Sequence, residues 1–235
     1  MDNLLDQPLS KIVLENFQTA QVLENNGLDF CCGGKQTLRT ACAAKGIEVA
    51  PVLNELNDIL STNDPSANFQ HLSLTTLTDY IVESHHAYVR KNIPLILGYL
   101  LKIATKHGDR FPHMKKVFLL FIEVRTEMQT HMQKEEEVVF PIIRRLDRHD
   151  ESNNVPNLNE RVALLENEHE NAGALMQKIR QLTNNYESPG GACTTFKLAL
   201  NALKAFEADL HKHVHLENNI LFPKAIARFE NIKAA

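Results

Sequence analysis

The sequence predicts an all-α protein in which an antiparallel four-helix bundle follows a small helical N-terminal domain. Glycine and proline number only 9 each among 235 residues, which favours long helices. From residue 73 onward, apolar residues recur in alternating steps of three and four, as on one face of a helix. No stretch alternates apolar and polar residues with period two, so no sheet is expected.

Residues 1–62 carry three short helical patterns. They lie near Leu9–Asn26, near Gln36–Lys45 and from Pro51 onward. Gly27 and Gly46 follow the first two patterns as helix-ending residues, and proline is favoured in a first helical turn. The turn-rich run Ser61-Thr-Asn-Asp-Pro-Ser66 then predicts a linker, taken as residues 63–72.

Residues 73–235 are predicted to form four long helices, with Ser73 as the first N-cap. The breaks between them are His107–Pro112, Arg148–Pro156 and Asn184–Gly191. Each helix has one apolar stripe, and four such helices with short connections form a bundle. In chain order the stripes are Val82, His86, Val89, Ile93, Leu97 and Leu100; Val117, Phe121, Val124, Met128, His131, Glu135, Val138 and Ile142; Val162, Leu165, His169, Ala172, Met176 and Ile179; and Phe196, Ala199, Leu203, Phe206, Leu210, His213, Glu217 and Ile220.

Six polar residues interrupt these stripes, and they repeat between the two halves of the bundle. The second and fourth helices share the pattern His-x-x-x-Glu-x-x-x-x-Phe-Pro, beginning at His131 and at His213. A spacing of four places histidine and glutamate side by side on one helical face. At the helical rise per residue, His86, His131, His169 and His213 all lie roughly 26–30 Å from their hairpin ends. The six side chains are therefore expected at one level of the bundle: His86, His131, Glu135, His169, His213 and Glu217.

A metal centre is the favoured interpretation of this level. Each unpaired buried polar group would cost about 1–3 kcal/mol, although six such groups could also satisfy one another by hydrogen bonds. Two metals ~3.5–4 Å apart could use all six, with Glu135 and Glu217 bridging. Imidazole with carboxylate suits iron, while manganese and zinc remain open by ligand type. Glu83 and Glu166, three residues before two of the histidines, are interpreted first as hydrogen-bond partners of the ligands and second as ligands themselves.

Other polar residues are expected to lie outside the metal centre. His211 and His215 flank His213 by two residues and are predicted to face solvent, as are Glu136 and Glu137. The histidines in the linker or near helix ends carry no expected role: His71, His107, His113 and His149.

The cysteines predict one further site. Cys31 and Cys32 precede Gly33-Gly34 in a loop before a helix, with Lys35 adjacent. A cation and a helix N-terminus both favour thiolate, although burial of the two cysteines as small apolar residues is as compatible with the pattern. Cys42 is expected to be packing, and Cys193 gives no clear signal.

Composition excludes several classes of protein. Twenty-five basic against 29 acidic residues give a net charge of −4, which argues against general binding to nucleic acid. The apolar stretches are far shorter than the ~20 residues that span a bilayer. The N-terminus has no pattern of a secretory signal, and no disulfide spacing is visible. We therefore expect a soluble cytoplasmic protein that binds neither nucleic acid nor membrane.

Several motifs resemble one known family. Asp29-Phe-Cys-Cys-Gly-Gly-Lys-Gln-Thr-Leu38 is similar to the N-terminal signature of the iron–sulfur cluster repair di-iron proteins, the RIC family (YtfE/ScdA/DnrN-type). The haemerythrin-like domain of that family is resembled by His131-Met-Gln-Lys-Glu-Glu136, Glu168-His169-Glu-Asn-Ala-Gly173 and Leu216-Glu-Asn-Asn-Ile-Leu-Phe-Pro223. The resemblance implies two non-haem irons held by the four histidines and two glutamates named above. At Ser84-His85-His86 the sequence departs from the family, and the apolar stripe favours His86.

The resemblance also implies a function, namely repair of iron–sulfur clusters damaged by nitric oxide or oxidants. We expect donation of labile iron rather than catalytic turnover, with Cys31 and Cys32 receiving iron or contacting the damaged iron–sulfur client. The alternatives are a sensor or carrier that binds O2 or nitric oxide reversibly, and a di-iron nitric oxide or nitrite reductase. A domain of about 60 residues is marginal alone, so it is expected to pack on its own bundle or within a homodimer.

Overall fold

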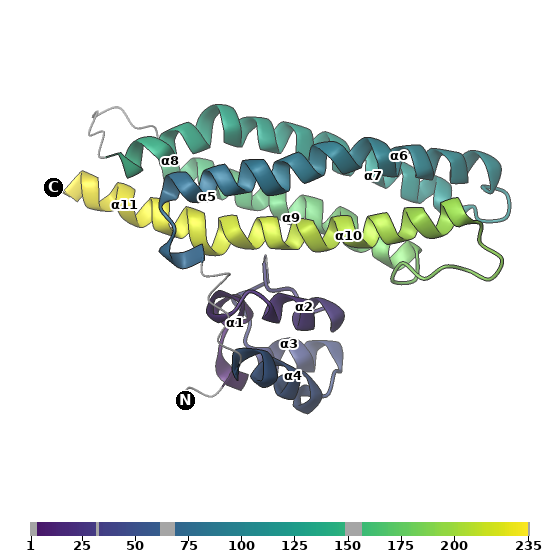
Figure 1. Cartoon of the computed structure of the whole chain (residues 1–235), viewed down its shortest axis with the longest axis horizontal. Coiled ribbons are helices and arrows are strands. Elements are labelled where there is room, and N and C mark those ends of the chain that lie inside the picture. The colour runs from purple at the N-terminus through teal and green to yellow at the C-terminus, as the bar shows by residue number, and fades with distance from the viewer. Residues whose placement is uncertain (1–3, 32, 62–68, 149–156, 235) are drawn as a thin grey trace. The chain divides into compact units, whose positions relative to one another are not determined.

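The computed structural model describes residues 4–31, 33–61, 69–148 and 157–234, and these residues form helices joined by loops, with no strand (Figure 1). They divide into two compact units, Met1–Leu77 with His211–Ala235, and Thr78–Leu210. The chain passes from the second unit to the first within one helix, α10 (Thr194–Leu216). The all-α prediction is therefore confirmed.

The N-terminal part has four short α-helices where three were predicted. The single helix expected near residues 9–26 is wrong, because α1 ends at Glu15 and α2 begins at Thr19. Asn16 causes the break: its side-chain oxygen accepts a hydrogen bond from the Gln18 amide at 2.9 Å, a turn that competes with the helix. The four helices are α1 (Leu9–Glu15), α2 (Thr19–Asn25), α3 (Leu38–Lys45) and α4 (Val49–Ser61).

Predicted capping residues begin and end helices as expected. Gly46 follows α3 with a φ of +66°, the left-handed conformation that ends many helices. The Ser73 hydroxyl accepts from the Thr76 amide at 3.1 Å and so caps α5. Most of the predicted linker and of the break before Pro156 lies outside the described residues.

The remaining elements are long helices with π-helical turns inserted in three places. A π-helix adds one residue to a turn and is often found at functional sites. The elements are α5 (Leu74–Tyr80), η4 (π, Ile81–His86), α6 (Ala87–Lys106), α7 (His113–Lys134), η5 (π, Glu135–Val139), α8 (Phe140–Asp147), α9 (Leu158–Leu182), α10 (Thr194–Leu216), η6 (π, Glu217–Leu221) and α11 (Phe222–Ala234).

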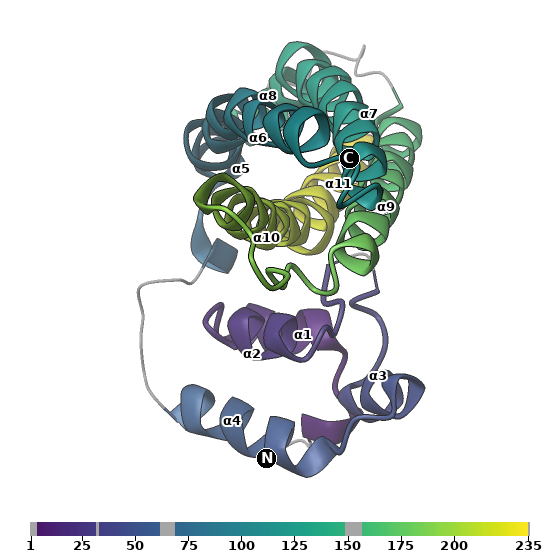
Figure 2. The ribbon, with the colours of Figure 1, turned by 90° about the vertical axis from the view of Figure 1, so that its right-hand side faces the viewer.

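Within the unit Thr78–Leu210, α6, α7, α9 and the first part of α10 form the predicted bundle (Figure 2). The Phe206 ring from α10 lies 5.3 Å from that of Phe121 and 6.4 Å from that of Tyr88, centroid to centroid. At the same helix, the Glu207 carboxylate accepts hydrogen bonds from Arg180 and from the Tyr186 hydroxyl, each at 2.8 Å. Aromatic packing and this buried polar group thus join α10 to α6, α7 and the end of α9.

At two of the π-helical turns, η4 and η5, the buried residue differs by one position from the predicted stripe. Ile81 is buried where Val82 was expected, and Val139 is buried where Val138 was expected. All six stripe residues of α9 are buried as predicted, and α9 has no π-helical turn among its described residues. A further error lies on α6, where Ile96 is buried and the predicted Leu97 is only half-buried, whereas Ile220 in η6 is buried as predicted.

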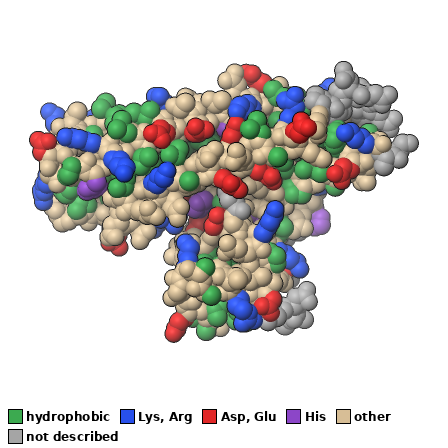
Figure 3. Space-filling view, turned by 180° about the vertical axis from the view of Figure 1, so that it is seen from behind, with side chains coloured by type: hydrophobic (Ala, Val, Ile, Leu, Met, Phe, Trp, Pro, Cys, Tyr) green, Lys and Arg blue, Asp and Glu red, His purple; other side chains and the backbone are tan. Residues whose placement is uncertain are grey.

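In the other unit, the segment from His211 onward packs with the N-terminal helices. Lys224 donates hydrogen bonds to the carbonyls of Gln70 and Leu72, and His211 and His215 face the Phe30 ring. Acidic and basic side chains are interspersed on the molecular face in Figure 3, as the small net charge predicts. No described helix is long and apolar enough to cross a membrane.

Candidate metal centre

Glu135 is the centre of the first group of predicted ligands. It begins η5 directly after α7, and its side chain is 0% exposed. Its Oε2 atom lies 3.3 Å from Nε2 of His86 and 3.3 Å from Nε2 of His131. One carboxylate oxygen therefore faces two imidazoles, one from the end of η4 and one from four residues earlier on α7.

His169 on α9 completes this group. Its Nε2 lies 2.9 Å from Nε2 of His131, and the two ring centroids are 4.5 Å apart. Two nitrogens bound to one metal at ~2.0–2.1 Å, at right angles, would be about 2.9 Å apart. The separation of the pair is compatible with a shared cation and with a hydrogen bond between the two rings.

The second half of the repeat supplies His213 and Glu217. His213 lies on α10 and Glu217 begins η6, so each repeated glutamate starts a π-helical turn. His213 Nε2 lies 2.9 Å from Glu217 Oε1, and both side chains are 0% exposed.

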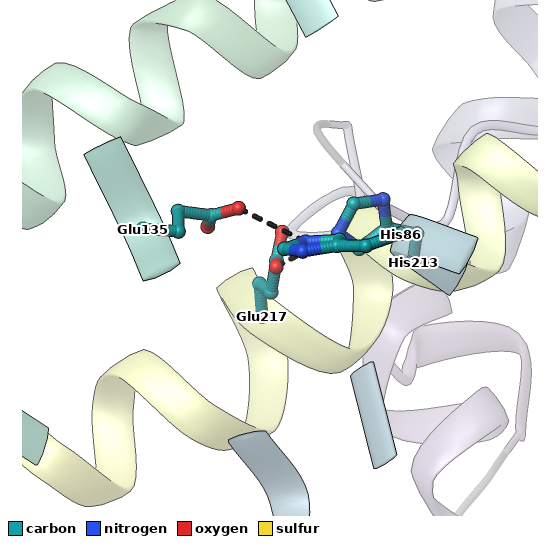
Figure 4. Close-up of side chains that lie close together, drawn as sticks. All are labelled: His86, Glu135, His213 and Glu217. Atoms are coloured by element: carbon teal, nitrogen blue, oxygen red, sulfur yellow. Dashed lines mark hydrogen bonds and ion pairs between the residues drawn. The ribbon is translucent and has the colours of Figure 1, made fainter. Parts of the chain in front are cut away.

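The six predicted residues form two overlapping sets of four. In each set the ligand atoms lie within 4.8 Å of one another: His86, Glu135, His213 and Glu217 in one (Figure 4), and His131, Glu135, His169 and Glu217 in the other. Both glutamates belong to both sets. Two imidazoles and two shared carboxylates per set are a donor arrangement that fits a carboxylate-bridged pair of non-haem metal ions.

Two further glutamates contact the Nδ1 atoms of two candidate ligand histidines, and the sequence predicted this role for neither of them. Glu136 Oε1 lies 2.6 Å from Nδ1 of His86 and 2.6 Å from Arg90, and Glu168 Oε2 lies 3.0 Å from Nδ1 of His131. Lys134 donates a hydrogen bond to the other oxygen of Glu168. Such partners fix which ring nitrogen faces a metal and raise its basicity.

The pKa values of these two carboxyl groups reflect the contacts. The hydrogen bond from His131, with that from Lys134, lowers the pKa of Glu168 to about 2 against the effect of burial. Burial raises the pKa of Glu136, but hydrogen bonds from His86 and Arg90 outweigh it and the net direction is downward. Both groups are therefore carboxylates at neutral pH, as a partner of a ligating histidine should be.

The prediction that Glu83 and Glu166 fill this role is wrong, because both side chains are exposed. The prediction that Glu136 faces solvent is also wrong, whereas Glu137 is exposed as expected. Position next to a ligand in the chain (Glu135–Glu136, Glu168–His169) was the available signal. A spacing of i−3, by contrast, selects Glu83 and Glu166, which are exposed.

The adjacent histidines His85 and His86 are both buried but differ in partners. His85 Nδ1 lies 3.0 Å from Asp209 Oδ1, and His85 belongs to neither set of ligand atoms. The structure thus brings His86 to the candidate centre, as the apolar stripe favoured.

His215 is fully buried, so its predicted exposure is wrong. The rings of Phe30 and Phe17 lie 5.5 and 6.0 Å from it, and Nδ1 is 3.4 Å from the Phe30 carbonyl oxygen. Burial lowers the pKa of His215 to about 4, despite an opposing effect of that carbonyl. His211 is only partly exposed, with Nδ1 3.9 Å from Glu24 Oε1. The amphipathic pattern of α10 could not reveal that the N-terminal domain covers this face.

Cys31 is buried, and both its amide and its thiol contact the carboxylate of Asp29. Its amide donates to Asp29 Oδ1 at 2.9 Å, and its thiol lies 3.1 Å from the same oxygen. Cys32 lies outside the described residues, so the predicted influence of Lys35 on the cysteine pair stays a prediction. A side chain at Gly34 would place its Cβ 2.3 Å from the Phe30 carbonyl oxygen, so this loop requires glycine there.

The other cysteines lie away from the centre. Cys42 is buried in α3, as predicted for packing, and burial raises the pKa of its thiol. Cys193 is exposed, with its sulfur 3.5 Å from His107 Nε2.

Paired histidine and glutamate ligands on a helical bundle define the class of haemerythrin-like cation-binding proteins. Residues 77–225 match the model of the hemerythrin HHE cation-binding domain, and residues 5–60 match the ScdA_N domain, a domain of unknown function (DUF542). The chain belongs to the ScdA/YtfE family of iron–sulfur cluster repair proteins.

Relatives in this family align over nearly their whole length. The iron–sulfur cluster repair protein ScdA of Staphylococcus epidermidis is 34% identical over 92% of this chain and 96% of its own. ScdA of Staphylococcus haemolyticus is 30% identical over 92% and 96%. The repair protein YtfE of Escherichia coli O157:H7 is 32% identical over 94% and 97%.

Proposed function

We propose that this chain is a di-iron protein that repairs iron–sulfur clusters damaged by nitric oxide or oxidative stress, by donating iron. The observation that carries the proposal is the pair of overlapping ligand sets, which share Glu135 and Glu217. The role in repair of iron–sulfur clusters is inferred from the names of the ScdA and YtfE relatives. Iron is the cargo, held by His86, His131, His169, His213 and the two glutamates.

The charged ligands and the hydrogen-bond partners of the histidines have different roles in holding iron. Glu135 and Glu217 are the two donors that carry formal charge, and each carboxylate can bridge. Glu136 and Glu168 accept from the Nδ1 atoms of His86 and His131, which makes Nε2 the nitrogen of each ring that would bind the cargo. Because four of the six donors are neutral, the site stabilises iron with little anionic charge. Weak neutralisation of the metal charge favours a labile cargo over a permanently held metal.

The loop of Cys31 and Cys32 is proposed to receive iron or to contact the client. Asn219, two residues after Glu217, has its amide nitrogen 3.4 Å from the Cys31 carbonyl oxygen. The loop is thereby attached to the helix that supplies two ligands. Replacing both cysteines with alanine should reduce repair while leaving iron content unchanged, and unchanged repair would remove the loop from the proposal.

The test uses the full chain loaded with ⁵⁷Fe and a hydratase whose [4Fe–4S] cluster has lost one iron, with dithiothreitol as reductant. Label entering the hydratase together with regained hydratase activity supports donation. Reversible O2 or nitric oxide binding without iron loss would indicate a sensor or carrier. Nitrous oxide formed over many turnovers would indicate a nitric oxide reductase.

Matched variants connect the result to the site. His86→Gln should abolish donation, whereas His85→Gln alters the neighbouring histidine outside both ligand sets and should retain it. We further propose that the protein works in the cytoplasm on iron–sulfur clients, and light scattering of the loaded protein will report whether it does so as a homodimer.

A further inference from the structure

An accessible thiol lies at the end of the bundle remote from the metal ligands, where the α6–α7 connection meets the start of α10 (Figure 1). Cys193 immediately precedes α10, roughly 20 residues or about 30 Å before His213 along that helix. Among the three described cysteines it alone is exposed, since Cys31 and Cys42 are buried. This thiol therefore has no part in the candidate metal centre.

Cys193 is paired with a histidine from another part of the fold. Its sulfur lies 3.5 Å from Nε2 of His107, the residue at which α6 ends. A thiol can transfer its proton to a neighbouring imidazole, and the thiolate that results is the nucleophilic form of cysteine. A nucleophile and a proton acceptor are thus brought together by residues far apart in the sequence.

The N-terminus of α10 adds a second feature to the same side chain. The carbonyl oxygen of Cys193 accepts hydrogen bonds from the amides of Phe196 and Lys197 at 3.0 and 3.2 Å, so Cys193 is the N-cap residue of this long helix. Cysteine is not among the residues that are favoured for capping. The partial positive charge of the helix N-terminus stabilises negative charge that develops on the sulfur.

The surface around this pair is basic, although the chain as a whole is acidic. Arg110 donates a hydrogen bond to the carbonyl oxygen of Gly190 at 3.2 Å, in the loop that ends at Cys193, and no described carboxylate forms an ion pair with it. Residues 102–116 include five exposed basic residues and one exposed acidic residue, namely Lys102, Lys106, Arg110, Lys115, Lys116 and Asp109. A reagent that approaches this end of the bundle therefore meets an excess of positive charge.

We propose that Cys193 and His107 form a site of thiol–disulfide exchange for anionic low-molecular-weight disulfides of the oxidised glutathione type. The Cys193 sulfur attacks one sulfur of the disulfide while its proton passes to Nε2 of His107. A sulfur–sulfur bond to Cys193 forms, the original one breaks, and the departing thiolate takes the proton from His107. Cys193 is thereby oxidised to a mixed disulfide, and the departing half of the reagent is reduced to a thiol.

The charge of the partner follows from the basic surface. Carboxylates of the reagent are attracted by Arg110 and its basic neighbours, and such attraction raises the rate of encounter. The site lies beyond the proposed iron chemistry, because the thiol is about 30 Å from the ligand His213 on the same helix.

The test exposes the full chain at pH ~7 to two disulfides of opposite charge, anionic oxidised glutathione and cationic cystamine. Peptide mass spectrometry measures the rate of adduct formation at Cys193, and a short unstructured peptide with one cysteine gives the intrinsic ratio of the two rates. Relative to that peptide, Cys193 should favour oxidised glutathione by roughly ten-fold or more, and salt at ~0.5 M should remove most of this preference. A ratio equal to that of the peptide would overturn the assignment to anionic disulfides.

Variants separate the charge of the site from its proton acceptor. Arg110→Gln should slow the reaction with oxidised glutathione several-fold and leave that with cystamine unchanged, whereas a structural disturbance would change both. Arg161→Gln, at an exposed arginine on α9, is the matched control. His107→Gln should slow both reagents about ten-fold, whereas His71→Gln, at an exposed histidine of the other unit, should slow neither. Unchanged rates in His107→Gln would overturn the pairing of thiol and imidazole.

Discussion

The Nδ1 atom of His215 lies 3.4 Å from the carbonyl oxygen of Phe30, and this contact attaches the cysteine loop to the ligand-bearing helix. Phe30 precedes Cys31, while His215 lies between His213 and Glu217 in the chain. The imidazole is fully buried against the rings of Phe17 and Phe30. A helix that supplies two candidate ligands therefore also supplies the docking surface for the loop.

Replacing His215 should release the loop. His215→Ala leaves a cavity beside Phe17 and Phe30, at a cost of about 2 kcal/mol, and should expose the buried Cys31 thiol. We expect alkylation of Cys31 by iodoacetamide, followed by peptide mass spectrometry, to accelerate roughly ten-fold or more. His71→Ala, at an exposed histidine in the short helix Phe69–His71, is the control. Equal labelling of Cys31 in both variants would contradict the docking role.

Removing the charge of Glu136 or Glu168 should weaken metal binding. Each accepts from the back of a ligand imidazole, and loss of such a partner typically costs about 10–100-fold in affinity. Glu136→Gln and Glu168→Gln should show this loss in competition with a chelator. Glu137→Gln changes the exposed neighbour and should bind metal normally. A normal affinity in either of the first two variants would show that their hydrogen bonds are incidental.

Replacing either of the two central carboxylates should lower the iron content per chain to the same extent. Glu135 and Glu217 each belong to both ligand sets, so Glu135→Ala or Glu217→Ala should disturb both metals rather than one. Elemental analysis after gel filtration should give well under one iron per chain for either variant, against two for the parent protein. Retention of one full equivalent would indicate separate sites without bridging.

Tyr186 should make the bundle sensitive to alkali. Burial, and then Glu207, raise the pKa of Tyr186, so the folded protein keeps the phenol protonated while the unfolded chain ionises near pH ~10. The unfolded state is then favoured by proton release, and stability should fall as the pH rises above ~10. Urea unfolding at pH ~8 and ~11 should show a smaller loss for Tyr186→Phe than for the parent. An equal loss in both would assign the alkaline sensitivity to other groups.

Regular helical periodicity predicted the bundle and the ligand level but not the local register. On α9 all six predicted stripe residues are buried, because nothing interrupts the described helix. At η4 and η5 the same reasoning selected Val82 and Val138, whereas Ile81 and Val139 are buried. No local propensity signals a π-helical turn, since it is stabilised by the packing and the site around it.

Helical periodicity has a second limit, because it does not predict which residues of other helices contact a given side chain. Glu136 and Glu168 reach histidines on neighbouring helices, and His215 is covered by the N-terminal domain. Periodicity assigns each side chain a face of its own helix, but it cannot say what packs there. The two domain signatures could be recognised from Cys31-Cys32-Gly33-Gly34 and the repeated His-x-x-x-Glu, because each is a short contiguous pattern.

In the segment from α10 into η6, candidate metal ligands alternate with residues that contact the cysteine loop. His213 and Glu217 belong to the ligand cluster, while His215 and Asn219 hold the loop. Thermodynamic linkage requires that any coupling between iron binding and loop docking be reciprocal. If iron strengthens loop docking by some factor, undocking of the loop lowers the affinity for iron by the same factor. Under the proposed function, a client that draws the cysteine loop away from this helix would therefore trigger iron release as the acceptor arrives.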